Sequence, residues 1–401
     1  MTGGVVAATR GFYDRMTYRG SMADSEGVDP DPVPRPEELE SFFHLVDVRR
    51  DGETIQYVGE SLVPERALLD RVAPAFYEAG YEVDLREVEG GHVLLARPIG
   101  TRPDGIPWAN LGLLLATILT TLFVGAYGWY YVPLSTIRSN PLTILQAWPF
   151  TAAVLGVLLT HELGHYAVGR YYGVNVSLPY VIPFVFPFGT LGAIIRMKGR
   201  IPSRRVLFDI GAAGPIAGLL ATVVVTAIGL SLDPIAVPER VLQRSGEVII
   251  FNDPPLLTWI ADALGRPTGY EDSAKAVHPV VIGGWVGMFF TLLNLLPVGQ
   301  LDGGHMTRAM LGERQETLAA LVPGALFSIA AYLHLVLDYG INESVGLWAF
   351  WGLFATVIAV SGSATPLDES ELGWPRLLVG IATFLVGATC FMLVPIQVVA
   401  A

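Results

Sequence analysis

Cysteine and lysine are almost missing from this chain of 401 residues. The single cysteine, Cys390, excludes an intrachain disulfide and any zinc site built from several thiolates. Lysine occurs only at Lys198 and Lys275, so 23 of the 25 basic residues are arginine. Charged residues make up 15% of the chain, against roughly 25% in soluble globular proteins. The net charge of -12 argues against a nucleic-acid partner.

Apolar residues dominate instead, at 52% of the chain with a mean hydropathy of +0.49. This composition predicts an α-helical polytopic membrane protein with a small soluble part. About 20 apolar residues are needed to cross a bilayer as a helix, and seven runs meet that requirement. The expected spans are 107–131, 145–171, 205–230, 279–297, 318–337, 345–361 and 376–396.

The soluble part precedes the first span. Residues 20–36 are rich in Pro, Asp, Ser and Gly, and we expect the whole segment 1–36 to be disordered. Residues 37–103 predict a small α/β domain in the order ββαββ, because Asp51-Gly52 and Gly90-Gly91 are hairpin signals on either side of a helical pattern at 63–79. We expect this domain to serve regulation or docking, and residues 104–401 to form the transmembrane domain.

The segment 176–197, after the second expected span, is apolar but does not suit one helix. Proline and glycine interrupt it at Pro179, Pro183, Pro187, Gly189 and Gly192. Non-helical backbone at membrane depth survives only where protein or water satisfies its polar groups. We therefore expect an extended hairpin or a re-entrant segment.

The distribution of basic residues orients the chain. They crowd the connections at 173–205 and 298–317, whereas the long loop 231–278 is acidic. The positive-inside rule then places the two basic connections in the cytoplasm of a cell-membrane protein. With seven spans, the N-terminal domain is also cytoplasmic and the C-terminus is outside.

A metal-binding pattern lies in the second span, at His161-Glu162-Leu163-Gly164-His165. Histidines four apart on a helix share one face, which lets both imidazoles bind one zinc ion. Glu162 lies about 100° around the helix from His161, beside the metal. That position suits a general base that deprotonates a water molecule on the metal.

A catalytic zinc needs a third protein ligand, and the soluble zinc-protease patterns do not supply it. The next histidine is His278, and no glutamate occurs between Glu162 and Glu239. The best candidate is Asp302, which follows the fourth expected span at the same depth as the two histidines. Proline and glycine around it weaken the helix and let the carboxylate turn towards the metal.

The histidine pair in one span, followed two spans later by Asn294-x-x-Pro297 and Asp302-Gly303, resembles the site-2 protease family of intramembrane zinc metalloproteases. The resemblance covers about 107–305 and leaves extra C-terminal spans at 318–396. It implies one Zn²⁺ held by His161, His165 and Asp302, with Glu162 as the catalytic base. It also implies that the protein hydrolyses peptide bonds in or near the transmembrane segments of membrane-protein substrates. The partners it implies are therefore such a substrate and membrane lipid.

Several assignments stay open within that resemblance. Asn294 has two possible roles. It binds the substrate backbone or the oxyanion, or its amide joins neighbouring helices by hydrogen bonds. The small residues of 211–218 are expected to pack helices closely, and His305 to line the pocket or meet lipid headgroups. A transporter or channel, and a non-catalytic scaffold, remain the alternative functions. The sequence does not indicate an oligomeric state.

Overall fold

The computed structural model describes most of the chain. The described residues are 34, 36–88, 91–98, 106–185, 187–198, 201–243, 247–362 and 364–400. The expected disordered segment, 1–36, lies almost wholly outside them.

The N-terminal domain is a four-stranded antiparallel sheet packed against one helix. Its strand order is β1-β2-β4-β3, and the elements follow one another as ββαββ. Phe43, Tyr57, Phe76 and Leu94 are fully buried between the sheet and the helix. The bounds are α2 Pro36–Leu39, β1 Phe43–Asp51, β2 Thr54–Ser61, α3 Glu65–Glu78, β3 Tyr81–Val88 and β4 Gly91–Pro98.

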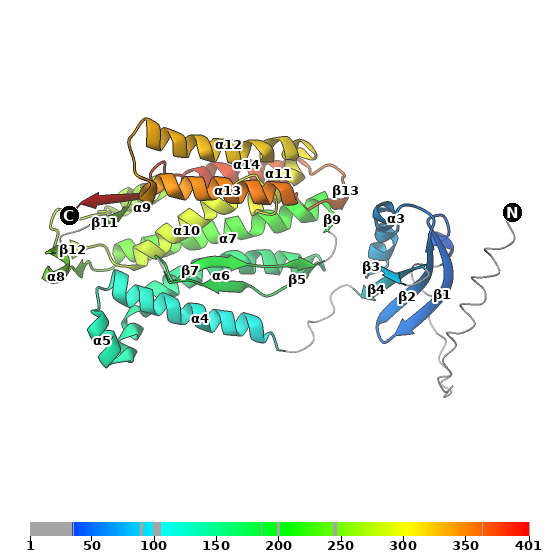
Figure 1. Cartoon of the computed structure of the whole chain (residues 1–401), viewed down its shortest axis with the longest axis horizontal. Coiled ribbons are helices and arrows are strands. Elements are labelled where there is room, and N and C mark those ends of the chain that lie inside the picture. Colours follow the sequence, from blue (N-terminus) through cyan, green and yellow to red (C-terminus); the bar gives the residue numbers. More distant parts are fainter. Residues whose placement is uncertain are drawn as a thin grey trace.

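The rest of the chain is a bundle of helices that run along the long axis of the molecule (Figure 1). The N-terminal domain lies beyond one end of this bundle, and the C-terminus lies at the other end. The main helices are α4 Trp108–Val124, α6 Trp148–Tyr171, α7 Arg204–Ser231, α10 Val280–Asn294, α11 Asp302–Leu311, α12 Arg314–Leu335, α13 Gly346–Ser361 and α14 Trp374–Ala388.

Within the described residues, five helices are long and apolar enough to cross a membrane. They correspond to five of the seven expected spans. The other two, α10 and α14, are apolar helices of 15 residues each, or about 22 Å, against roughly 30 Å of hydrocarbon. The protein is therefore a polytopic membrane protein with a β-rich N-terminal domain, and the count of seven stays a prediction.

The last expected span, 376–396, is longer than the helix that the structure shows. Helix α14 ends at Ala388, and the chain continues as β14 Ile396–Ala400, which pairs antiparallel with β11 Glu247–Phe251. The residues of α14 and of β14 are both apolar, so hydropathy does not mark the point where the helix ends.

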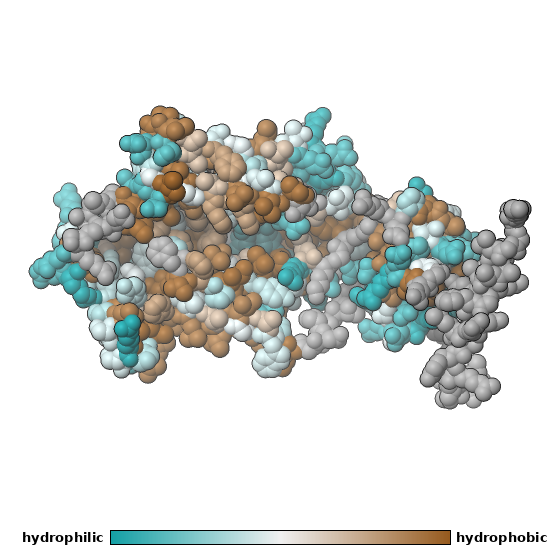
Figure 2. Space-filling view, viewed as in Figure 1, coloured by the Kyte–Doolittle hydropathy of each residue, from teal (hydrophilic) through white to brown (hydrophobic). Residues whose placement is uncertain are grey.

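The surface of the bundle matches a lipid environment. Apolar side chains cover the helices over much of the visible face, whereas polar residues gather on the N-terminal domain and at the ends of the bundle (Figure 2). Large apolar residues are strongly exposed on several helices, including Leu115, Leu220, Leu321 and Val360. Such exposure is costly in water but suits contact with acyl chains.

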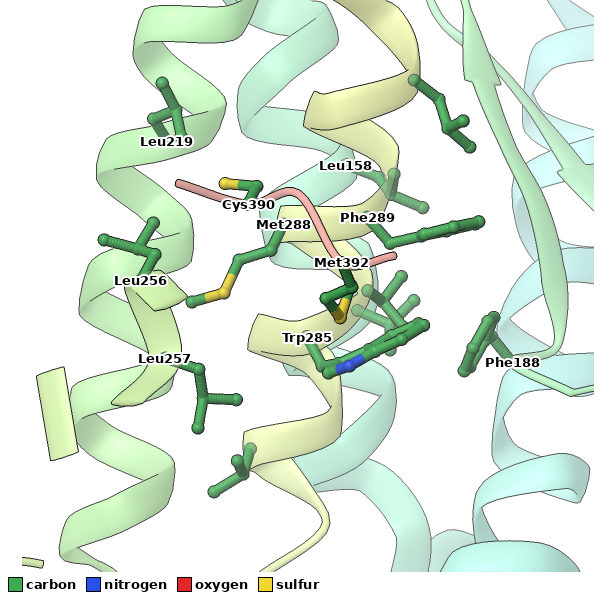
Figure 3. Packing of buried hydrophobic residues seen from close by; sticks show 14 of the residues in the cluster. Leu158, Phe188, Leu219, Leu256, Leu257, Trp285, Met288, Phe289, Cys390 and Met392 are labelled. Atoms are coloured by element: carbon green, nitrogen blue, oxygen red, sulfur yellow. The ribbon is translucent and has the colours of Figure 1, made fainter. Parts of the chain in front are cut away.

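Helices α6, α7 and α10 pack closely because glycines lie at their contacts. A Cβ on Gly283 would collide with Ala153, and one on Gly287 would lie 2.7 Å from Val157. Small residues at such contacts bring membrane helices together. Trp285 of α10 lies among Phe188, Phe289 and other buried apolar side chains (Figure 3).

The broken segment forms strands, as its prolines and glycines predicted. β6 Tyr180–Pro183 and β7 Thr190–Ile194 make an antiparallel hairpin, and β5 Asn175–Val176 pairs with β8 Met197–Lys198. The Thr117 hydroxyl donates to the carbonyl of Val181 at 3.0 Å. Polar groups of α4 thus satisfy hairpin backbone that would otherwise face hydrocarbon.

The segment between α13 and α14 links the bundle to the N-terminal domain. β13 Pro366–Asp368 pairs in parallel with β9 Ile201–Ser203, at the end of the bundle nearest that domain (Figure 1). Leu367 packs against the apolar core of the domain, and Glu369 makes an ion pair of 2.7 Å with Arg308 of α11.

Candidate metal centre

Helix α6 brings His161 and His165 onto one face. Both residues are almost completely buried, and their Nε2 atoms lie 3.2 Å apart. The four-residue spacing produces this geometry because it advances the helix by slightly more than one turn.

Asp302 joins them from a separate part of the chain. Its Oδ2 atom lies 2.9 Å from His161 Nε2, and its Oδ1 atom lies 3.1 Å from His165 Nε2. Asp302 is the first residue of α11, which packs directly onto the turn that precedes it. A Cβ on Gly303 or on Gly304 would collide with carbonyl groups of that turn, so the two glycines let the helix begin there.

The three side chains suit one zinc ion. Two ligand atoms at about 2.0–2.1 Å from a tetrahedral zinc lie roughly 3.3 Å apart, close to the separations observed. Two imidazole nitrogens and a carboxylate oxygen are also ligands that zinc accepts, and three protein ligands leave a fourth position open.

A backbone group fixes one of these ligands. The Nδ1 atom of His165 lies 2.7 Å from the carbonyl oxygen of Ile210 in α7, to which it donates. The proton is then on Nδ1, which leaves the Nε2 lone pair free to bind a metal. This second contact holds the ring in the orientation that the site needs.

Helix α7 leaves space for both rings. Gly214 faces the His165 ring so closely that a Cβ would overlap it, and a Cβ on Gly218 would lie 2.7 Å from His161 Nδ1. The sequence predicts that these small residues pack helix against helix. They do so, and in addition they accommodate the two imidazoles.

Glu162 lies next to the triad and is 5% exposed. Its carboxylate lies close to the backbone of Ile195, just after β7. It lines a cavity of about 820 Å³ together with His165, Asn294, Asp302 and His305. The candidate base and two of the candidate ligands therefore face a space that holds more than a water molecule.

Two further predicted residues also lie here. The Nδ2 atom of Asn294, the last residue of α10, is 3.3 Å from His161 Nε2. His305 is 5% exposed and lies one turn after Asp302, with its Cβ facing Gly211. His305 thus belongs to the cavity wall. Every predicted site residue is brought to this one place.

Some residues of the site carry no recognisable pattern in the sequence. The carbonyl of Ile210 is a backbone group, so its contact with His165 has no signature of its own. Arg196 lines the cavity as well, although it belongs to no motif. Only the fold brings these two groups to the metal ligands.

Comparison with known proteins agrees with a zinc metalloprotease site. Residues 149–337, which include all three candidate ligands, match the model of peptidase family M50. The chain is 36% identical over 248 residues to probable zinc metalloprotease EGY1, chloroplastic, of Arabidopsis thaliana, which covers 61% of this chain and 42% of that protein. Probable zinc metallopeptidase EGY3, chloroplastic, of the same plant is 26% identical over 381 residues, or 87% of this chain and 62% of that protein.

The chain spans less than half the length of the EGY1 relative. Among solved structures, the site-2 protease from Methanocaldococcus jannaschii is 17% identical, covering 63% of this chain and 89% of that one, with a TM-score of 0.33. That likeness is too slight to support an argument. The family match and the plant relatives agree with the paired motifs, and together they support the site-2 protease family, peptidase family M50.

Proposed function

We propose that this protein is an intramembrane zinc metalloprotease that hydrolyses peptide bonds in or near the transmembrane segments of membrane proteins. One observation carries the proposal: two histidines of α6 and an aspartate of α11 converge beside a buried glutamate inside an apolar bundle. Ionisable groups at membrane depth are costly and by default mark function.

His161, His165 and Asp302 would hold the zinc. When bound, zinc lowers the pKa of water and polarises a carbonyl group, which is the chemistry that peptide hydrolysis needs. The second contact of His165, to the carbonyl of Ile210, would keep that ligand oriented while the substrate enters.

Glu162 is the proposed general base. It would take a proton from the attacking water and pass it to the leaving amine. It lines the cavity beside Ile195, and its near-complete burial keeps bulk water from competing for the proton.

Asn294 is the proposed donor to the substrate. Its amide nitrogen lies beside the ligand set, so it is within reach of a carbonyl oxygen that approaches the same metal. A donor at this place would stabilise the negative charge that develops on that oxygen.

The hairpin is the proposed docking site for the substrate. A helical segment hides its carbonyl groups in its own hydrogen bonds and must unwind before it is cut. Residues Ala193–Met197 follow the cavity wall, and an extended substrate added beside β7 would gain backbone hydrogen bonds in place of those it loses.

The proposed location is the cell membrane. The charge asymmetry supports an arrangement with the N-terminal domain and the metal-site end of the helices in the cytoplasm and the C-terminus outside. The N-terminal domain and the C-terminus lie at opposite ends of the bundle (Figure 1), as this orientation requires.

The test is co-expression with single-span reporter proteins that carry a tag on each side of the membrane. We expect the wild type to release a tagged fragment, and Glu162→Gln to bind zinc but release none. The control is Glu271→Gln, an exposed glutamate outside the bundle, which should cleave as the wild type does. Equal cleavage by Glu162→Gln would rule out its role, whereas ion flux without any product would favour a transporter.

A further inference from the structure

Asp209 lies directly before Ile210, whose carbonyl oxygen accepts the hydrogen bond from His165. Arg376 holds its carboxylate in a bidentate contact, with Nε and Nη2 each 2.8 Å from a different oxygen. The hydroxyl of Tyr172 donates to Oδ2 at 2.6 Å.

These three residues belong to three separate parts of the bundle. Tyr172 directly follows α6 as its C-cap residue, Asp209 lies in α7 and Arg376 lies in the first turn of α14. The side chains of Asp209 and Arg376 are 20% and 35% exposed, so the ion pair is only partly screened by solvent. Bidentate arginine–carboxylate pairs fix direction as well as distance.

The orientation of α7, which the Asp209–Arg376 pair fixes, determines what surrounds the metal ligands. Ile210 is the neighbour of Asp209, and Gly214 and Gly218 follow on the side that faces the imidazoles. A rotation or slide of α7 would withdraw the Ile210 carbonyl from His165 and bring backbone or side chains against the rings. A fixed Asp209 therefore fixes the surroundings of His165.

We propose that Asp209, held by Arg376 and Tyr172, is a positioning residue for the metal ligand His165. The inference rests on the proposed zinc site. It gives α14 a part in metal binding, although Arg376 lies beyond the residues that match the family model. If Asp209 only held helices together, its loss would lower the stability of the bundle and leave the affinity for metal unchanged.

The experiment measures metal binding by the full chain in detergent, without any substrate. Zinc affinity is obtained by competition with a chromophoric chelator, and the ligand geometry from the visible spectrum of the Co²⁺ form. Asp209→Asn should weaken zinc binding by about 10-fold, the lower end of the effect of losing a group behind a metal ligand, because the Ile210 carbonyl is displaced but not removed. It should also shift the Co²⁺ bands. Tyr172→Phe should act in the same direction and less strongly.

Two controls separate positioning from general damage. Asp272→Asn removes the same charge from an exposed ion pair with Lys275 in a distant loop, and should bind zinc as the wild type does. The exchange Asp209→Arg with Arg376→Asp should recover at least part of the zinc affinity that either single change loses.

Wild-type zinc affinity and Co²⁺ spectrum in both Asp209→Asn and Tyr172→Phe would overturn the proposal, even if the variants melt at lower temperature. If Asp209→Asn does not fold, Tyr172→Phe alone decides, because it removes one hydroxyl and no charge. These measurements need no cleavage, so they are independent of whether the chain proves to be a protease.

Discussion

Gly214 of α7 lies so close to His165 of α6 that a Cβ at this position would overlap the imidazole nitrogen facing Asp302. The glycine therefore belongs to the metal centre as well as to the helix contact. The ring has little room to move away, because its other nitrogen is held by Ile210 and its neighbour is His161.

We expect Gly214→Ala to displace the His165 ring and to lower zinc affinity by about 10-fold or more. Overpacking at such a contact costs roughly 1–3 kcal/mol, so the variant should still fold. Zinc per protein after dialysis against a weak chelator measures the effect. The matched control is Gly156→Ala on α6, where a Cβ meets nothing within 4 Å. Full zinc content in Gly214→Ala would contradict the crowding that the structure shows.

The ligand pair could be foreseen because a spacing of four is local and survives any packing of the helix. Asp302 was harder, since its place depends on how α11 meets α6. The glycines and proline near Asp302 indicate a bend in the backbone at that point. In the structure, a Cβ on Gly303 or Gly304 would collide with the preceding turn. The broken hairpin was likewise predictable, because proline and glycine act on the backbone wherever they occur.

What escaped prediction depends on contacts far apart in the chain. Asp209 and Arg376 are separated by 167 residues, and no motif near either residue predicts that they form an ion pair. The pairing of β14 with β11 is of the same kind, and it explains why the last expected span was too long. Hydropathy reports an apolar environment, whereas the end of a helix depends on which partner accepts its next hydrogen bonds.

Removal of the metal should abolish cleavage without unfolding the bundle. A strong chelator added to detergent-solubilised protein should stop product formation, and added zinc should restore it. Asp302→Asn should show the same loss from the start and recover poorly at equal zinc, because a neutral amide is a weaker ligand than a carboxylate. Product formation is followed on a gel, with zinc content measured in parallel. Undiminished cleavage by metal-free protein would contradict the proposed chemistry.

Proline placed in β7 tests the docking of an extended substrate. We expect Ala193→Pro and Ile194→Pro to reduce cleavage strongly, since proline removes a backbone donor from the strand beside the cavity. Zinc content should stay at the wild-type level. Val185→Pro is the control, because this exposed residue lies in the hairpin outside both strands. Normal cleavage by both strand variants would exclude strand addition at β7.

The core of the N-terminal domain should be sensitive to truncation. Phe76 is fully buried and meets the Tyr57 ring edge-on at 5.2 Å. Phe76→Ala should lower the free energy of unfolding of this domain by about 3–5 kcal/mol. Hydrogen exchange of β1 to β4 in the intact chain measures it. Leu62→Ala, at a position 57% exposed, should change the free energy by less than about 0.5 kcal/mol.

The same domain should lose stability in alkali. Burial raises the pKa of Tyr77 to about 12, and burial likewise raises the pKa of Tyr57 above its ordinary value. A tyrosine in the unfolded chain ionises at about pH 10, below the raised pKa values of the folded domain. Between these pH values the folded domain therefore retains protons that the unfolded chain releases. The stabilisation is complete below about pH 10 and is lost as the pH rises towards 12.

Cleavage of the full chain by an alkali-tolerant protease, followed from pH 8 to 11, should therefore accelerate within the N-terminal domain above about pH 10. Tyr57→Phe keeps the buried ring but removes the ionising hydroxyl and its 3.0 Å hydrogen bond to the Pro34 carbonyl. The variant should start from lower stability and lose less of it between pH 9 and 11. An equal loss in wild type and variant would show that some other group than Tyr57 drives the alkaline transition.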